Sequence, residues 1–310
     1  LEAMDAYCTG YKQFLDAGKT ERECVDRTIA LAEAAGFRAY RRGMELKPGD
    51  KVYRANRGKA VMLAVLGRRG LDQGVNIAAA HIDSPRLDLK QNPLYEDGGF
   101  AYLDTHYYGG VKKYQWVTIP LAIHGVIVKK DGTCVEINIG ENEDDPVFFV
   151  SDLLIHLAQE QLEKKAAKVI EGEALDIIVG NKPLLIDKKD KKKDEKEAGK
   201  EAVKAGVLDI LKETYDIHEE DFVSAELEIV PAGKAREAGF DRSMTLAYGQ
   251  DDRVCAYTSM QAMLDSDVTD RTMCCILVDK EEIGSVGATG MQSHFFENAV
   301  AEVMNLAGEY

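Results

Sequence analysis

The chain has 310 residues, a formal net charge of −15 and 45% hydrophobic residues. This length fits two domains better than one, and the hydrophobic share allows a sizeable core without disulfides or structural metal. The acidic balance argues against a general nucleic-acid binder, which needs a basic face for phosphates.

No apolar run is long enough to predict a membrane-spanning helix. The first twenty residues are polar and helical in pattern and contain no signal-peptide core, so a cytoplasmic location is expected. The six cysteines have no CxxC spacing, and two of them lie inside an apolar run. This pattern predicts reduced, buried thiols and no disulfide framework.

The first part of the chain predicts a capped helix followed by a hairpin. Thr20 and Glu23 have the spacing of a capping box, with Thr20 as the N-cap of a helix that has one apolar face. Residues 51–56 and 59–66 favour two strands around a tight turn. Residues 74–80 form a short apolar strand that leads directly into a polar cluster.

The middle of the chain has a different, β-rich character. Residues 118–129 and 134–139 predict two strands, with Asp131-Gly132 as the turn between them. Residues 152–164 predict a helix. Residues 188–200 are a mixed-charge, low-complexity stretch, whose simplest interpretation is a solvated loop or a frayed helix.

Strands and helices alternate again in the last part of the chain. We expect helices over 201–215, 251–264 and 292–306, and strands over 223–230 and 272–279. The alternation predicts an α/β protein with a mostly parallel, doubly wound sheet. The middle segment is then a second, β-rich domain inserted into that sheet.

Potential metal ligands follow two of the predicted strands. The strand over 74–80 ends on His81-Ile82-Asp83, and the strand over 272–279 is followed by Glu281-Glu282. In open α/β sheets, ligands bind beyond the carboxyl ends of the strands. We therefore expect these two clusters to meet in space although they are far apart in sequence.

His81 and Asp83 are two positions apart, and such residues share a face in extended backbone. This spacing suits a histidine that binds metal through one ring nitrogen while a carboxylate holds the other ring N–H. The alternative is a strand-end histidine beside a surface aspartate, because the HxD pattern is common by chance.

Glu281 and Glu282 point in different directions in extended backbone, so that one can bind metal while the other acts as a general base. The alternative is a solvated surface pair. The glycines within 284–290 indicate close backbone approach. A phosphate-binding interpretation of that loop lacks both the Walker lysine and the GxGxxG spacing.

Asp251 and Asp252 stand just before a predicted helix. Either residue could be a helix N-cap or a first-turn carboxylate. A single aspartate could also bridge two metal ions that share one water. Local spacing leaves both interpretations open.

Three segments together resemble the M18 family of metallo-aminopeptidases. They are AHIDSPRLDLK at 80–90, AYGQDDRVCAYTSM at 247–260 and LVDKEEIGSVGATG at 277–290, in this order. The resemblance is nearest to the aminopeptidase I branch and extends along nearly the whole chain. It implies a zinc-exopeptidase-like domain formed by 1–88 and 222–310, with an inserted dimerisation domain at 89–221.

The resemblance also implies a role for each polar residue. His81 would bind zinc and Asp83 would orient it. Asp251 would bridge two metal ions, Glu282 would be a further metal ligand, and Glu281 would be the general base. Two zinc ions per subunit are expected, with Mn²⁺ or Co²⁺ as alternatives that the same ligand types accept.

His156 matches a family position at which a histidine of the small domain reaches the active site of a neighbouring subunit. The competing interpretation is one apolar-flanked residue of a helix at the domain surface. The family assembles into dimers and then into dodecamers, so self-association is expected, with peptides as substrates and without nucleic acid or membrane as partners.

The chain departs from the family in its length. Family members continue beyond the position of Tyr310, and the missing part should supply another carboxylate and a final histidine ligand. We therefore expect the second catalytic part, 222–310, to be incomplete. The expected function is a dinuclear zinc aminopeptidase. The alternatives are a related deacylase of N-acyl amino acids and a catalytically incomplete oligomeric scaffold.

Overall fold

The computed structural model describes residues 2–184 and 201–309. The chain divides into two compact units. Unit 1 is formed by Leu1–Pro85 together with Lys234–Tyr310, and unit 2 by Arg86–Gly233. Unit 2 is thus an insertion in the chain of unit 1.

The inserted unit ends later in the sequence than predicted, at 233 and not at 221. The reason is strand β10 (Ala225–Pro231), which pairs antiparallel with β5 (Arg86–Asp97) and with β7 (Leu121–Val128). These backbone hydrogen bonds fasten β10 to the inserted sheet. Hydrophobic periodicity identifies a strand but does not identify its partners.

Unit 1 is an α/β structure with one sheet in the order β1-β2-β3-β13-β4. Its helices and strands are α1 (Glu2–Ala17), α2 (Glu21–Ala34), β1 (Arg38–Ala39), β2 (Lys51–Asn56), β3 (Ala60–Val65), η1 (Leu71–Gln73), β4 (Asn76–His81), β11 (Arg236–Ala238), β12 (Met244–Leu246), α5 (Gln250–Leu264), β13 (Met273–Val278), η7 (Glu281–Ile283) and α6 (Phe295–Leu306).

Strand directions in this sheet are mixed, where the sequence predicted mostly parallel pairing. β1 runs parallel to β2 and β13 runs parallel to β4, whereas β3 is antiparallel to both of its neighbours. The tight turn of the β2–β3 hairpin makes the first antiparallel pair unavoidable. The α/β class itself is confirmed.

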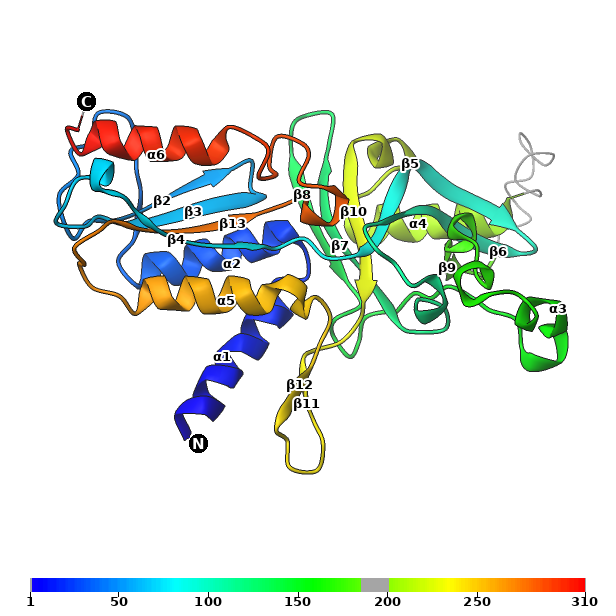
Figure 1. Cartoon of the computed structure of the whole chain (residues 1–310). Coiled ribbons are helices and arrows are strands. Elements are labelled where there is room, and N and C mark those ends of the chain that lie inside the picture. The colour runs from blue at the N-terminus through cyan, green and yellow to red at the C-terminus, as the bar shows by residue number, and fades with distance from the viewer. Residues whose placement is uncertain (1, 185–200, 310) are drawn as a thin grey trace. The chain divides into compact units, whose positions relative to one another are not determined.

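The central strands β3 and β13 send alternate side chains into two cores. Val61, Leu63 and Cys275 pack with α1, α2 and α5 on one face. Met62 and Cys274 pack with α6 on the other face. Figure 1 shows α6 on one side of the sheet and α2 and α5 on the opposite side. All residues of β3 are buried because helices cover both faces of the sheet.

Local signals at the start of the chain are confirmed. The Thr20 side chain accepts the Glu23 backbone N–H, and the Glu23 carboxylate accepts the Thr20 N–H. The predicted hairpin is present as β2 and β3. All six cysteines are free, as predicted, but Cys8, Cys134 and Cys255 are exposed and not buried.

Unit 2 is built on one antiparallel sheet in the order β8-β7-β10-β5-β6-β9. Its elements, apart from β5, β7 and β10, are β6 (Phe100–Tyr108), η2 (Lys113–Gln115), β8 (Cys134–Ile139), η3 (Ile155–Leu157), α3 (Gln159–Leu162), η4 (Ala166–Lys168), η5 (Gly172–Ala174), β9 (Ile177–Gly180), α4 (Ala202–Tyr215) and η6 (Glu219–Ser224).

The helix predicted over 152–164 is wrong. The structure has only the 3-10 turn η3 and the single turn α3 in this segment. Most helical stability in proteins comes from packing an apolar face. Here the apolar residues remain exposed, with Leu154, Ile155 and Leu157 all above half exposure. The mixed-charge stretch at 188–200 lies outside the described residues.

Among the described residues, no helix combines the length and apolar character needed to cross a bilayer.

Candidate metal centre

The pairing of β4 with β13 brings the two predicted ligand clusters of unit 1 to the same edge of the sheet. The strands are parallel, and Val278 lies opposite His81 in the register. Beyond Val278, the chain turns at Lys280, which has a φ of 73°, and enters η7. The structure thus places Glu281 beside the end of β4, as expected from the sequence.

Asp83 is completely buried and connects the two clusters. Its Oδ1 lies 3.4 Å from His81 Nδ1. Its two carboxylate oxygens accept the backbone N–H groups of Glu281 and Glu282, each at 3.2 Å. The alternative of a surface aspartate is therefore wrong. Asp83 orients the imidazole and fixes the turn that carries both glutamates.

Asp251 approaches His81 from the opposite side of the ring. Its Oδ1 lies 3.3 Å from His81 Nε2, and its side chain is 89% exposed. The backbone of Asp251 is extended, with φ −87° and ψ 110°. Asp252 instead lies beside the Cys255 thiol and raises the pKa of that thiol through a hydrogen bond. Of the two aspartates, Asp251 is the one that faces the histidine.

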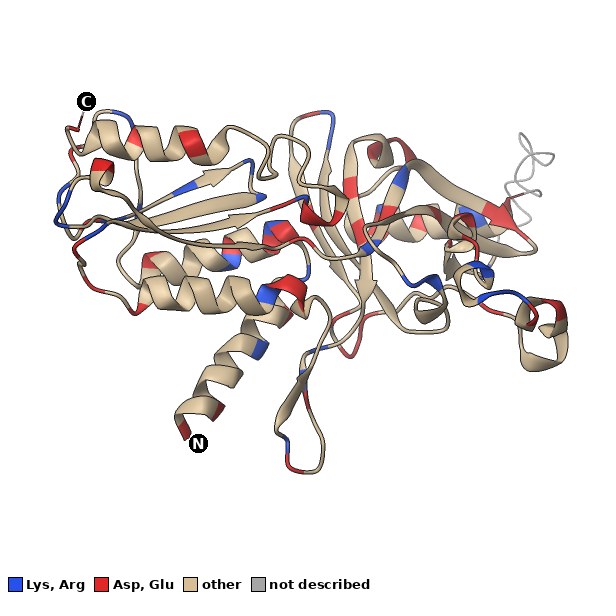
Figure 2. Cartoon of the chain, viewed as in Figure 1, with Lys and Arg blue, Asp and Glu red and all other residues tan. Residues whose placement is uncertain are grey.

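Acidic groups crowd this edge of unit 1, as Figure 2 shows after β13 and at the start of α5. Glu281 Oε2 lies 3.7 Å from His81 Nε2, and its side chain is 56% exposed. Glu282 is half-buried, with its backbone held by Asp83. His156 lies in unit 2, on the exposed turn η3.

The charges around His81 change its proton affinity. Burial by itself lowers the pKa of His81, but the hydrogen bond and charge of Asp83, aided by Glu281, outweigh it and raise the pKa to about 9. The environment therefore favours a positive charge at this position. A divalent cation would satisfy the same preference in place of the proton.

A buried arginine that sequence reasoning missed supports the loop of His81 and Asp83. Arg253 donates from Nε and Nη2 to the carbonyl oxygen of Ile82, at 3.2 and 3.1 Å, and from Nη2 to that of Lys19 at 2.9 Å. In the sequence, only its position directly after Asp252 pointed to this supporting role. Through the carbonyl oxygen of Ile82, Arg253 thus holds in place the peptide between His81 and Asp83.

Two further hydrogen bonds fasten the loop before α5 to the end of β4. Ser84 Oγ donates to the Asp251 carbonyl oxygen at 3.0 Å, and the Tyr248 hydroxyl donates to the Pro85 carbonyl oxygen at 3.0 Å. Gly249 lies between them with a φ of 77°, and a Cβ there would stand 2.0 Å from Arg253 Nη1. Only glycine fits this position.

The donor set agrees in kind with a zinc site, since imidazole and carboxylate are both zinc ligands. His81 Nε2 faces Asp251 and Glu281, and its other nitrogen is held by Asp83, as in metal-bound histidines. Within the described residues, however, His81 belongs to no trio of ligand atoms that lie within 4.8 Å of one another. The described residues thus provide part of a coordination shell.

Comparison with known proteins identifies the relatives of this chain. Residues 14–309 match the family model described as aminopeptidase I zinc metalloprotease (M18). A probable M18 family aminopeptidase 1 of Clostridium acetobutylicum is 61% identical over 100% of this chain and 65% of its own length. The chain therefore spans about two thirds of that relative's length.

Solved structures agree. The crystal structure of an M18 family aminopeptidase from Thermotoga maritima matches with a TM-score of 0.91 and 44% identity, over 100% of this chain and 65% of that one. The mApe1 dodecamer of S. cerevisiae matches with a TM-score of 0.74 and 19% identity, over 99% of this chain and 67% of that one, which shows a shared fold only.

Replacing Arg253 tests its structural role. Arg253→Met leaves the carbonyl oxygens of Ile82 and Lys19 without this donor, and each such loss costs about 1–3 kcal/mol. We expect urea denaturation to give a free energy of unfolding at least about 2 kcal/mol lower. The matched control is Arg271→Gln, at an exposed arginine, which should change the value by less than about 0.5 kcal/mol. Equal effects of both variants would contradict the role.

The pKa of His81 tests the role of Asp83. Folding raises this pKa from an ordinary 6.5 to about 9, so the interaction stabilises the metal-free chain fully below about pH 6.5 and is lost as pH rises through about 9. In Asp83→Asn, burial remains while the charge is removed, and the pKa should fall by more than about two units. NMR titration of the His81 ring measures it; an unchanged midpoint would refute the role.

Proposed function

The chain belongs to the M18 family of zinc metalloproteases, and on this premise we propose that it carries the catalytic core of an aminopeptidase. The proposed reaction is the removal of N-terminal residues from peptides. The observation that supports it is the convergence of His81, Asp251 and Glu281 around one imidazole nitrogen, with Asp83 behind the ring.

Each residue of this cluster has a proposed task. His81, Asp251 and Glu282 would hold zinc, with Asp251 shared between two ions in each subunit and Mn²⁺ or Co²⁺ as alternatives. Zinc bound there would polarise the scissile carbonyl and lower the pKa of a bound water towards about 7. Asp83 keeps His81 Nδ1 occupied, so that Nε2 faces the ligands.

Glu281 is the proposed general base. Its carboxylate is half-exposed at the site and can receive the proton of the attacking water, then pass it to the leaving amine. The buried carboxylate of Asp83 accepts the Glu281 backbone N–H and so fixes the point from which this side chain extends.

Removing the base separates catalysis from metal binding. In the full-length gene product, Glu281→Gln should lower kcat for aminoacyl-p-nitroanilides by at least about 10², because the amide cannot accept the proton. Zinc content by elemental analysis should stay unchanged. Glu297→Gln, an exposed residue of α6, serves as the control. Turnover near that of the unmodified protein would refute the base.

The same preparation distinguishes two alternatives. A related deacylase would hydrolyse N-acetyl amino acids and leave aminoacyl-p-nitroanilides intact. An oligomeric scaffold would retain no stoichiometric zinc after purification. Because the chain spans 65% of the length of its Clostridium relative, the activity is proposed for the whole protein. Its cytoplasmic location stays a prediction from the sequence.

Self-association is the second part of the proposal. The apolar side chains around His156 in unit 2 are 53–67% exposed, which is unusual for a cluster of this size. They are Leu153, Leu154, Ile155 and Leu157. We assign this strip, which we call the His156 strip, to contact with a second copy of the protein, in dimers and in a dodecamer. His156 would then act in the active site of the neighbouring subunit.

Mixed oligomers test this assignment. Glu281→Gln and His156→Ala subunits should each be nearly inactive alone in the full-length protein. When they are co-assembled, each mixed contact pairs an intact Glu281 in one subunit with an intact His156 from the other, and peptidase activity should return to about a quarter to a half of normal. The two variants carry different affinity tags, so that purification on both tags in turn isolates mixed oligomers, and no recovery in these would refute a trans role.

A further inference from the structure

Basic side chains are concentrated in one segment of an otherwise acidic chain. Residues 38–59 contain eight lysines and arginines against two carboxylates, Glu45 and Asp50, whereas the whole chain has a net charge of −15. The segment includes the loop between β1 and β2 and all of β2. Such a reversal of sign creates a local field that attracts anions.

The segment lines two adjoining hollows against helix α6, both within unit 1. One hollow, of about 440 Å³, is lined by Arg42, Arg54 and Asn305, and the other, of about 400 Å³, by Arg54, Arg57 and His294. Arg54 and Glu302 belong to both. The two hollows therefore adjoin at Arg54 and Glu302, and we call them together the arginine groove, defined by Arg42, Arg54, Arg57, His294 and Asn305.

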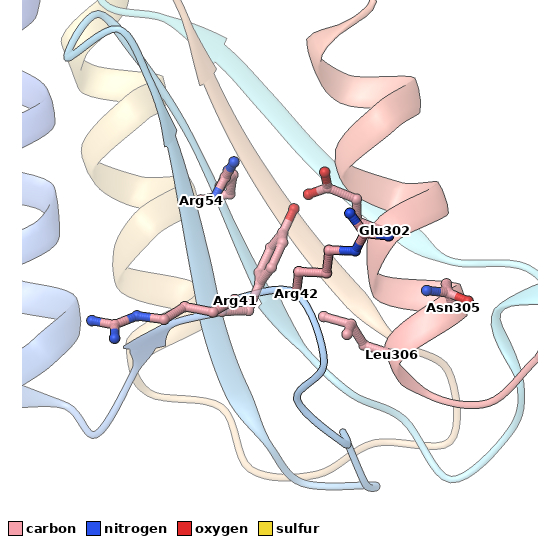
Figure 3. A pocket seen from close by; sticks show the side chains of 7 residues that line it. Arg41, Arg42, Arg54, Glu302, Asn305 and Leu306 are labelled. Carbon is pink, nitrogen blue, oxygen red and sulfur yellow. The ribbon is translucent and has the colours of Figure 1, made fainter.

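Arg42 and Arg54 reach the groove from different segments of the chain, as Figure 3 shows, whereas the guanidinium of Arg41 extends away from Glu302. Arg54 also lies over the ring of Tyr40, with 5.7 Å between its guanidinium carbon and the ring centroid. This aromatic contact restricts the side chain without neutralising it.

The guanidinium groups of the groove carry charge that the described residues do not neutralise. Within residues 2–184 and 201–309, no carboxylate oxygen lies within 4.0 Å of Arg42, Arg54 or Arg57. By contrast, Arg38 and Arg69 of the same unit pair with Asp50 and Asp270 at 3.3 and 3.2 Å. Among the described residues, these two arginines of unit 1 thus form ion pairs with carboxylates, whereas the three arginines of the groove do not.

The other groups of the groove are compatible with an anion. Burial and the nearby Glu302 raise the pKa of Tyr40, so that its hydroxyl stays neutral, and it donates to the Ala299 carbonyl oxygen at 3.4 Å. Among residues 2–184 and 201–309, Glu302 is the one carboxylate that lines the two hollows. Three guanidinium groups and one carboxylate leave the groove positive.

We propose that the arginine groove binds a small anion with several charged oxygens, of the oligophosphate or polycarboxylate class. Guanidinium groups bind such oxygens through paired N–H donors. An anion with charges at both ends can span the two hollows, with Arg42 at one end and Arg57 at the other. Arg54, which lines both hollows, then contacts its middle. None of these residues belongs to the candidate metal centre.

Titration calorimetry with the full-length protein measures this binding directly. Tripolyphosphate and citrate are the probes, with chloride at matched ionic strength as the reference. We expect at least one probe to bind one site, and Arg42→Gln and Arg54→Gln to weaken it by at least about fivefold each. Arg54→Lys should weaken it less, since the charge remains. The preferred probe decides between phosphate and carboxylate oxygens.

Two further variants make the test specific. Glu302→Gln removes the opposing carboxylate and should tighten binding by about two- to fivefold, a gain that a misfolded protein cannot show. Arg271→Gln, at an exposed arginine outside the groove, should leave the affinity unchanged. Absence of binding at millimolar probe, equal competition by chloride, or equal losses in Arg54→Gln and Arg271→Gln would overturn the proposal.

Discussion

The candidate metal centre depends on one buried carboxylate, that of Asp83. It orients the His81 ring and accepts the two backbone N–H groups of the turn that carries Glu281 and Glu282. A buried carboxylate is costly unless several donors surround it, so the position specifies its neighbours strictly. This group fixes the turn after β13 to the end of β4, in addition to the pairing of the two strands and the 3.7 Å approach of Glu281 Oε2 to His81 Nε2.

The second constraint on the centre comes from the hydrogen bonds of Arg253. Arg253 is almost completely buried and donates to backbone carbonyl oxygens of the β4 end and of the loop before α2. Together with the bond from Ser84 to the Asp251 backbone, it makes the three chain segments of the centre one hydrogen-bonded assembly. The carboxylates of Asp251 and Glu281, which face His81 Nε2, remain exposed. The supporting residues Asp83, Ser84 and Arg253 are thus buried, while the two carboxylates face solvent.

The sequence predicted the features that local rules govern. The capping box of Thr20, the β2–β3 hairpin and the polar clusters at two strand ends follow from spacing and periodicity alone. The sequence did not predict the features that depend on partners distant along the chain. Strand β10 alternates like any strand, and only its pairing assigns it to unit 2. Arg253 has no motif of its own, because its partners are backbone carbonyls, which every residue has. The helix expected over 152–164 fails because nothing described packs on its apolar face.

Unit 1 contains two clusters of like charge, and each of them has a cost in repulsion. Carboxylates gather around His81, and guanidinium groups gather along the arginine groove, although mixing the two would relieve repulsion at both places. A bound counter-ion offsets such repulsion, because binding to the folded state stabilises it by an amount that grows with the logarithm of ligand concentration over the dissociation constant. The acidic cluster suits a divalent cation and the groove suits an anion. In both clusters, like charges repel one another, and an ion of opposite charge would offset that repulsion.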